Sequence, residues 1–123
     1  MGGYIQVSTT VERREDAEEI AKVLIERRLA GCVQMVGPVV STYRWKGKVE
    51  TAEEWLILVK SREELYGELE KAIEEVHPYE TPEIIATPIV AGNKGYLEWL
   101  SEVLGPPQEQ CAGDIRTMGR QIR

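Results

Sequence analysis

Histidine and cysteine are scarce in this chain, whose 123 residues include one histidine, two cysteines and no phenylalanine. Two cysteines are too few for a disulfide-stapled scaffold. The longest apolar run covers only residues 55–59, whereas a membrane-spanning helix needs about 20 apolar residues. The first residues also lack a basic stretch followed by an apolar one, which predicts no secretory signal. We therefore expect a cytoplasmic protein that neither spans nor binds a membrane.

Basic residues are outnumbered, because 15 Lys and Arg stand against 21 Asp and Glu, giving a formal net charge of −6. An acidic chain is poorly suited to neutralising phosphates, which argues against a nucleic-acid partner. Hydrophobic residues make up 42% of the sequence. Because domains usually run to about 100–200 residues, these values predict one domain with one core.

Hydrophobic spacing predicts the order β-α-β-β-α-β followed by one more helix. The expected strands cover residues 4–10, 32–45, 48–59 and 83–90, and the expected helices cover 15–29, 61–76 and 93–104. The predicted fold class is α+β, a ferredoxin-like βαββαβ sandwich with an additional C-terminal helix. We assign residues 1–104 to this domain. Residues 105–123 form a tail of unknown role, and Cys111 within it is assigned no role.

Local signals refine this outline. Gly31 is predicted to cap the first helix in a left-handed conformation. Ser61 and Glu64 have the spacing of a capping box, and Asn93 is a suitable N-cap for the last helix. Pro78 is expected to end the second helix at residue 76. The Gly37-Pro38 pair predicts a bulge or bend in the second strand.

Two helices on one face of the sheet leave the other face open. That face must be polar, lie under the last helix, or be buried by another subunit. Because the predicted hairpin strands are long and aromatic, we favour another subunit.

The only histidine lies in a segment with two prolines and two further carboxylates, His77-Pro78-Tyr79-Glu80-Thr81-Pro82-Glu83. Imidazole and carboxylate groups are common ligands of copper and zinc, so His77, Glu80 and Glu83 are candidate metal ligands. The alternative is a stiff connector with solvent-facing side chains. An extended chain would separate His77 from Glu83 by roughly 20 Å. The segment therefore needs ligands from elsewhere to surround one ion.

Other chemistry-bearing residues are weaker candidates. Tyr43 and Trp45 on the hairpin could stack on a ligand, although such residues more often fill an interface. Lys60 ends an apolar strand and either points outward to solvent or binds an anion. Cys32 is either a soft ligand or, more commonly, a small buried hydrophobe. We see no phosphate loop and no nucleophile–base pair, so we expect no enzyme.

Taken together, these motifs resemble those of the CutA divalent-cation tolerance family over residues 4–104. The landmarks, in order, are Arg28-Leu29-Ala30-Gly31-Cys32-Val33, Ser41-Thr42-Tyr43-Arg44-Trp45-Lys46-Gly47, Glu54-Trp55-Leu56-Ile57-Leu58-Val59-Lys60, His77-Pro78-Tyr79-Glu80-Thr81-Pro82-Glu83-Ile84 and Tyr96-Leu97-Glu98-Trp99-Leu100. The resemblance implies a ferredoxin-like subunit in a homotrimer joined through edge strands, similar to the trimers of PII signalling proteins. It also implies a role in tolerance of copper and other divalent cations.

The resemblance carries over only part of a copper site. Copper-binding members have been linked to a cysteine at the end of the first strand, where this chain has Thr9. They have also been linked to a histidine at the position of Val76, and to the glutamate retained here as Glu83. We therefore expect weak binding of a divalent cation, such as copper, at a subunit boundary.

Two other functions stay open. One is a PII-like module that binds a small metabolite between subunits through Tyr43, Trp45 and Lys60. The other is a structural trimer that anchors an unknown protein partner.

Overall fold

The computed structural model describes residues 3–107, so the predictions for Cys111 and for the tail beyond 107 lie outside the described residues. The strands are β1 (Tyr4–Val11), β2 (Cys32–Trp45), β3 (Lys48–Arg62) and β4 (Ile85–Ile89). The helices are α1 (Arg14–Glu26), the short 3₁₀ turn η1 (Glu63–Leu65), α2 (Tyr66–Val76) and α3 (Lys94–Val103). This is the predicted order of elements, and the α+β class is confirmed.

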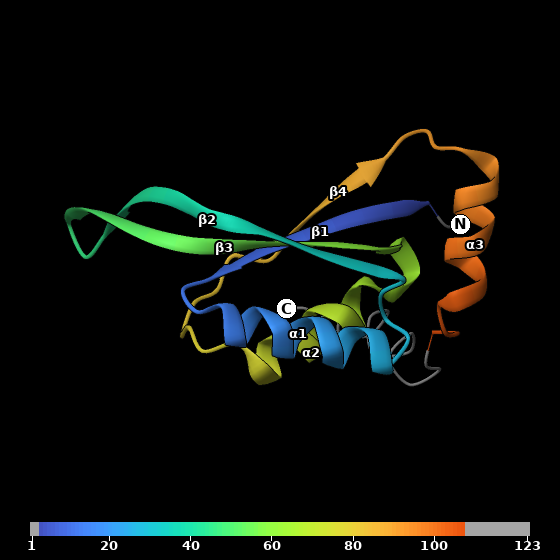
Figure 1. The fold of residues 1–123 in the computed structure, drawn as a ribbon, viewed down its shortest axis with the longest axis horizontal. Coiled ribbons are helices and arrows are strands. Elements are labelled where there is room, and N and C mark those ends of the chain that lie inside the picture. Colours follow the sequence, from blue (N-terminus) through green and yellow to red (C-terminus); the bar gives the residue numbers. More distant parts are fainter. Residues whose placement is uncertain (1–2, 108–123) are drawn as a thin grey trace, which may run out of the picture.

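The four strands form one antiparallel sheet in the order β2-β3-β1-β4. Helices α1 and α2 lie together on one side of it, and α3 stands at one end (Figure 1). The β2–β3 hairpin extends well beyond the layer of helices (Figure 1). Lys46 and Gly47 form its turn with φ values of 52° and 80°, the left-handed geometry typical of two-residue hairpin turns.

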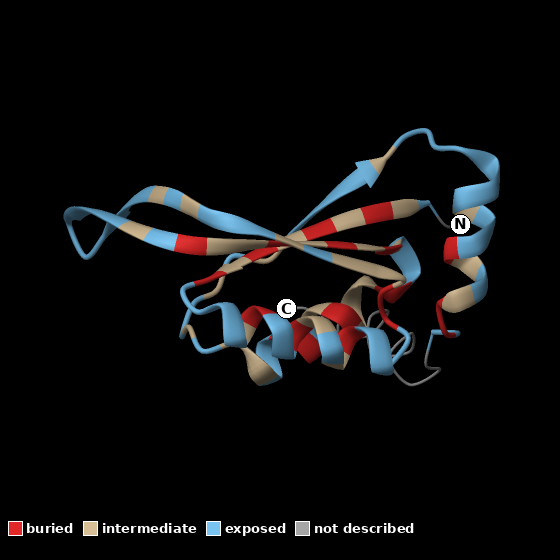
Figure 2. Ribbon diagram, viewed as in Figure 1, coloured by how far each residue is buried: buried red, intermediate tan, exposed pale blue. Residues whose placement is uncertain are grey.

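The core lies between the sheet and the two helices, as Figure 2 shows. Every second residue of β1 is buried, from Ile5 to Val11, because successive strand residues point to opposite faces. Ile20 and Leu24 of α1 meet that face, and both are fully buried. Burying a side chain of this size contributes about 1.5–3 kcal/mol, so this layer supplies most of the chain's apolar stabilisation.

The opposite side of the sheet, which we call the open face, has no helix lying across it (Figure 1). Its residues in the four-stranded part, identified from the register, are Tyr4, Gln6, Ser8, Cys32, Gln34, Leu58, Lys60, Arg62, Ile85, Thr87 and Ile89. The apolar run of β3 is therefore divided between two environments. Ile57 and Val59 are fully buried under the helices, whereas Leu56 and Leu58 on the other face are only half-buried.

Two predicted caps are wrong. Helix α1 ends at Glu26, and the residue with positive φ after it is Arg28 (59°) rather than Gly31. Gly31 is needed for a different reason, because a Cβ there would collide with Cδ1 of Leu100 on α3. The close approach of α3, which lies far away in the sequence, requires a residue without a side chain at position 31.

The predicted capping box at Ser61 is also absent. Strand β3 runs on through Ser61, whose hydroxyl donates a buried hydrogen bond of 2.7 Å to the carbonyl oxygen of Leu29. The helical segment then starts with η1, and its N-cap residue Arg62 makes no side-chain capping bond. The Ser61 hydroxyl therefore binds the distant Leu29 carbonyl oxygen and does not cap the helix that follows it in the sequence.

Several local predictions are confirmed. The β2–β3 register shifts between Val36 and Val39, at the cis Gly37-Pro38 bond. Helix α2 ends at Val76, as Pro78 requires. The side chain of Asn93 accepts a hydrogen bond from the Tyr96 amide, 2.9 Å away, at the start of α3.

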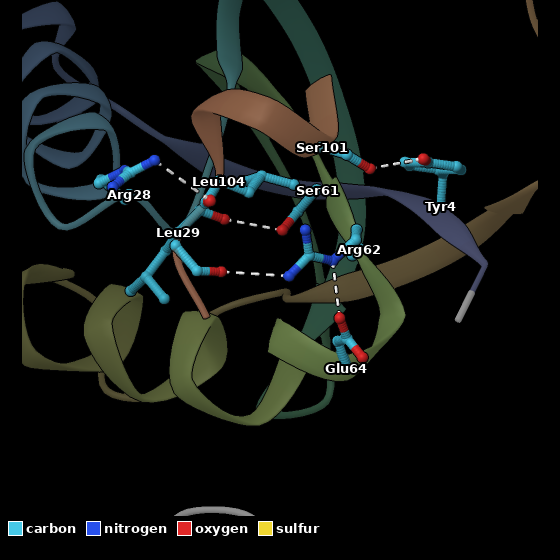
Figure 3. Close-up of polar contacts among 9 residues, drawn as sticks. Tyr4, Arg28, Leu29, Ser61, Arg62, Glu64, Ser101 and Leu104 are labelled. Carbon is cyan, nitrogen blue, oxygen red and sulfur yellow. Dashed lines mark hydrogen bonds and ion pairs between the residues drawn. The ribbon is translucent and has the colours of Figure 1, made fainter. Parts of the chain in front are cut away.

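Two arginines hold the end of α3 against the rest of the chain (Figure 3). The Arg28 guanidinium donates to the carbonyl oxygens of residues 102, 103 and 104 at 3.0–3.4 Å. Arg62 donates to the carbonyl oxygen of Gly105 at 3.1 Å and pairs with Glu64 at 2.8 Å. The Arg28 contacts satisfy carbonyl groups that a helix end leaves without partners, and Arg62 holds the chain just after the helix.

Candidate functional site

His77 follows α2 directly and has an extended backbone (φ −78°, ψ 134°), as expected for a residue before proline. Its Nδ1 accepts a hydrogen bond from the Tyr79 amide at 3.1 Å. The proton of the neutral ring is therefore on Nε2, which donates to the Thr10 carbonyl oxygen at 3.0 Å and lies 3.1 Å from the Thr9 hydroxyl. Both ring nitrogens have partners within the chain.

Burial lowers the pKa of His77, because the charged imidazolium loses solvation. The Thr10 carbonyl and the carboxylates of Asp16 and Glu54 oppose this shift, but burial is the larger effect. A proton on Nδ1 would also displace the Tyr79 amide. The ring is therefore neutral at pH 7 and ties the loop after α2 to the end of β1.

Tyr79 provides the second attachment of this loop. Its hydroxyl donates a hydrogen bond of 2.6 Å to Oε2 of Glu54 on β3, and the Glu54 residue is only 7% exposed. Burial, followed by the hydrogen bond and charge of Glu54, raises the pKa of Tyr79 well above its ordinary value. The tyrosine therefore stays a neutral donor and satisfies a buried carboxylate.

The two predicted carboxylate ligands lie beyond these attachments. Glu80 and Glu83 are exposed, within a segment without regular structure that leads into β4. In residues 3–107, no group of three or more His, Cys, Asp or Glu side chains is arranged to hold a metal ion. The described part of one chain therefore offers carboxylates on an anchored loop rather than a complete metal site, and no residues within 3–107 fit a tightly held resident metal.

The two positions at which the resemblance implied further copper ligands have structural roles in this chain. Thr9 is fully buried, with its hydroxyl beside Nε2 of His77. Val76 is half-buried and packs against the hydrophobic core. Neither side chain supplies a strong metal ligand at this point.

The residues predicted to bind a small ligand are not brought together within one chain. Tyr43 pairs with Glu50 in the hairpin, whereas Lys60 pairs with Cys32 near the other end of β3. Ten residues along a strand span about 33 Å. Trp45 contacts Lys46 at the hairpin tip, with Nζ 5.7 Å from the ring centroid. A shared site for Tyr43, Trp45 and Lys60 would need more than one subunit.

Sequence reasoning missed Glu54, Thr10 and Gln34. Glu54 adjoins the apolar run of β3, and a carboxylate at the edge of a buried strand was the available signal. Thr10 acts through its backbone carbonyl, which leaves no trace in the sequence. Gln34 is identified only by its contact with Lys60, where its Oε1 accepts a 2.9 Å hydrogen bond from Nζ.

The family model described as "CutA1 divalent ion tolerance protein" matches residues 5–103 of this chain. This chain belongs to the CutA1 divalent ion tolerance family. The match includes β1, the anchored loop and α3, so it spans the whole candidate site. It confirms the resemblance inferred from the sequence motifs.

Individual CutA relatives agree with this assignment. A divalent-cation tolerance protein CutA from Thermus thermophilus is 46% identical over 99 residues, which are 80% of this chain and 96% of that protein. A mouse protein CutA is 40% identical over 106 residues, 82% of this chain. The chain spans only 60% of the mouse protein's length, so the longer relatives contain segments without a counterpart here.

Solved CutA structures share the fold. The Thermus thermophilus Cut A1 structure has a TM-score of 0.81 at 44% identity, covering 83% of this chain and 99% of that one. A structure from Archaeoglobus fulgidus, described as a periplasmic CutA, has a TM-score of 0.79 at 39% identity, covering 85% of this chain and all (100%) of that one. In the described part of this chain, no helix is long and apolar enough to cross a membrane.

Proposed function

We propose that this chain takes part in the response to and tolerance of divalent metal ions, copper among them, by binding them weakly at subunit boundaries of a homotrimer. The observation that carries the proposal is the loop of residues 77–83 in a member of the divalent ion tolerance family. His77 and Tyr79 fix its start, and the carboxylates of Glu80 and Glu83 remain exposed. The protein acts by binding rather than by catalysis.

The trimer is proposed from the surfaces that one chain leaves uncovered. Strands β2 and β4 are the two edges of the sheet, and unpaired edges are templates for strand pairing. On the hairpin, Val40 is 68% exposed and Val49 is 65% exposed. A two-stranded ribbon is marginally stable alone, which favours neighbouring copies packing against it. Analytical ultracentrifugation tests this, with three times the 13.9 kDa chain mass expected and a stable monomer contradicting it.

The proposed ligands are His77, Glu80 and Glu83, and their contacts account for weak binding. The two carboxylates are open to solvent, whereas the imidazole must first release the Tyr79 amide from Nδ1. Losing such a hydrogen bond costs about 1 kcal/mol. A cation would complete its coordination with groups of a neighbouring subunit, because one chain has no three-ligand group among its described residues.

Calorimetric titration of CuCl₂ into the full chain tests the site. We expect weak saturable binding, with affinity reduced severalfold in Glu80→Gln and Glu83→Gln and also in His77→Ala. Glu19→Gln, an exposed α1 carboxylate with the same charge change, is the matched control and should bind as the parent does. Unchanged binding in all three site variants would overturn the proposed ligands.

A second candidate is a PII-like module that binds a small metabolite between subunits. The observation that favours it is Lys60, a half-buried cation with no ion pair to any residue of the described 3–107 region. Tyr43 and Trp45 would have to come from a neighbouring copy. A tryptophan fluorescence response to a nucleotide or carboxylate would support this role. An anchoring role would instead require a stoichiometric protein partner in pull-downs.

The proposal includes the cellular compartment of the protein. We propose a cytoplasmic protein, and the free thiol of Cys32 suits a reducing compartment. Because an Archaeoglobus relative is described as periplasmic, fractionation of cells that express the full chain is the appropriate test.

A further inference from the structure

A polar row crosses all four strands on the open face. In the register, Cys32 pairs with Lys60, Lys60 with Gln6, and Gln6 with Thr87. Directly paired residues share a face, with Cβ atoms about 4.5–5.5 Å apart. The side chains of four different strands are thus neighbours in one line, in a sheet whose other face is mostly apolar.

Charge on this face is of one sign. Although the chain carries a net charge of −6, the open face of the four-stranded part contains no Asp or Glu. Arg62 is one of its two cations, and it is paired with Glu64. Lys60, the other, contacts only the neutral Gln34 among the interactions found in residues 3–107. The ammonium group therefore has no counter-charge in the described chain.

The contact between Lys60 and Gln34 also orients hydrogen-bond donors. Because Oε1 of Gln34 accepts from Nζ of Lys60 at 2.9 Å, the amide NH₂ of Gln34 is left with two donors beside the ammonium. Lys60 retains two of its three donors. A cation beside oriented N–H groups, without a carboxylate, is the arrangement that binds an oxyanion through charge-assisted hydrogen bonds.

We infer that Lys60 and Gln34, with Gln6 beside them, form a binding site for a small oxyanion, a phosphate or carboxylate group, on the open face. This site is separate from the loop of residues 77–83. If further copies cover the open face, desolvation increases the need for a counter-ion at Lys60. The inference deepens the second candidate function, which also rests on Lys60, by naming the ligand class and the residues beside the ammonium. It does not depend on metal binding, so it and the metal-binding proposal can fail separately.

The test is an NMR titration of the ¹⁵N-labelled full chain with inorganic phosphate at constant ionic strength, and a second titration with citrate as the carboxylate probe. We expect saturable shifts of the Lys60 and Gln6 amides and of the Gln34 side-chain NH₂ with at least one probe. Lys60→Met should weaken binding at least about tenfold, and Lys60→Arg should retain it. Lys22→Met, an exposed α1 lysine with the same charge change, should leave affinity within about twofold.

Three outcomes would overturn the inference. One is the absence of a saturable shift with both probes in the parent chain. Another is equal weakening in Lys60→Met and Lys22→Met, which indicates general charge attraction. The third is dissociation of an oligomer in Lys60→Met while the parent binds neither probe, which would assign the counter-charge to a neighbouring copy. Because Lys60→Arg keeps the charge, it remains informative if Lys60→Met does not fold.

Discussion

The hydroxyl of Tyr79 lies 2.6 Å from Oε2 of Glu54, and this hydrogen bond joins the loop after α2 to β3. It satisfies a carboxylate that is only 7% exposed. The loop that carries the proposed cation ligands is thus attached to the sheet through a partly buried polar contact.

We predict that Tyr79→Phe destabilises the chain by about 1–3 kcal/mol, because the buried Glu54 carboxylate loses its donor. Urea denaturation of the parent and the variant measures this difference. Tyr43→Phe makes the same change at a residue that is 43% exposed and is the control. Adding Glu54→Leu to Tyr79→Phe should recover much of the loss, since both polar partners are then gone. A stability equal to the parent's in Tyr79→Phe would contradict a structural role for this contact.

Protonation of His77 should destabilise the fold. Because burial lowers its folded pKa below the ordinary 6.5, the unfolded state binds the proton more tightly. The contribution of His77 is therefore complete above pH 6.5 and is lost as pH falls from 6.5 toward the lowered folded value. Between pH 7.5 and pH 5.5, the free energy of unfolding should fall more in the parent than in His77→Asn, as measured by denaturation at both pH values. An equal loss of unfolding free energy in the two chains would contradict the claim that protonation of His77 destabilises the fold.

Gly31→Ala should destabilise the chain by about 1–3 kcal/mol, because its Cβ would collide with Leu100. Gly3→Ala is the control, since the nearest atom to a Cβ there is 3.8 Å away. The Gly31→Ala/Leu100→Ala double variant should lose less stability than the sum of the losses in Gly31→Ala and Leu100→Ala measured separately. Thermal denaturation of the four variants measures this, and strict additivity would exclude the contact as the cause.

Arg28→Ala should loosen α3, because three carbonyl oxygens at its C-terminal end lose their donor. We expect faster hydrogen exchange of α3 amides relative to those of α1 and α2. Arg27→Ala is a matched control, because within residues 3–107 the Arg27 side chain forms an exposed pair with Glu75 and no bond to α3. Equal exchange of α3 in both variants would show that Arg28 does not hold this helix.

Much of the fold follows from local sequence features. The alternation in β1, the Lys46-Gly47 turn and the stop before Pro78 act within a few residues, and each predicted feature is present. The predicted last strand, residues 83–90, contains the observed Ile85–Ile89 and extends beyond it at both ends. Such features are determined by backbone sterics and hydrophobic period, which one sequence reveals.

The predictions that were wrong, those for Gly31 and Ser61, share a different cause. Gly31 is small because of Leu100, and Ser61 bonds Leu29 instead of capping a helix. In both cases the partner is about 30 or more residues away in the chain. The candidate site follows the same rule, because His77 was identifiable as the only histidine, whereas its partner Thr10 is defined by tertiary contact.

The most direct test of the proposed function is the anomalous difference density of a crystal of the full chain soaked with copper. We predict a copper peak at a subunit boundary, bound by the carboxylate oxygens of Glu80 or Glu83 and by a group of a neighbouring subunit. Copper–oxygen distances near 2.0–2.2 Å, as for comparable metal ligands, would identify direct coordination. Copper bound only elsewhere, with no density beside residues 77–83, would contradict the proposal.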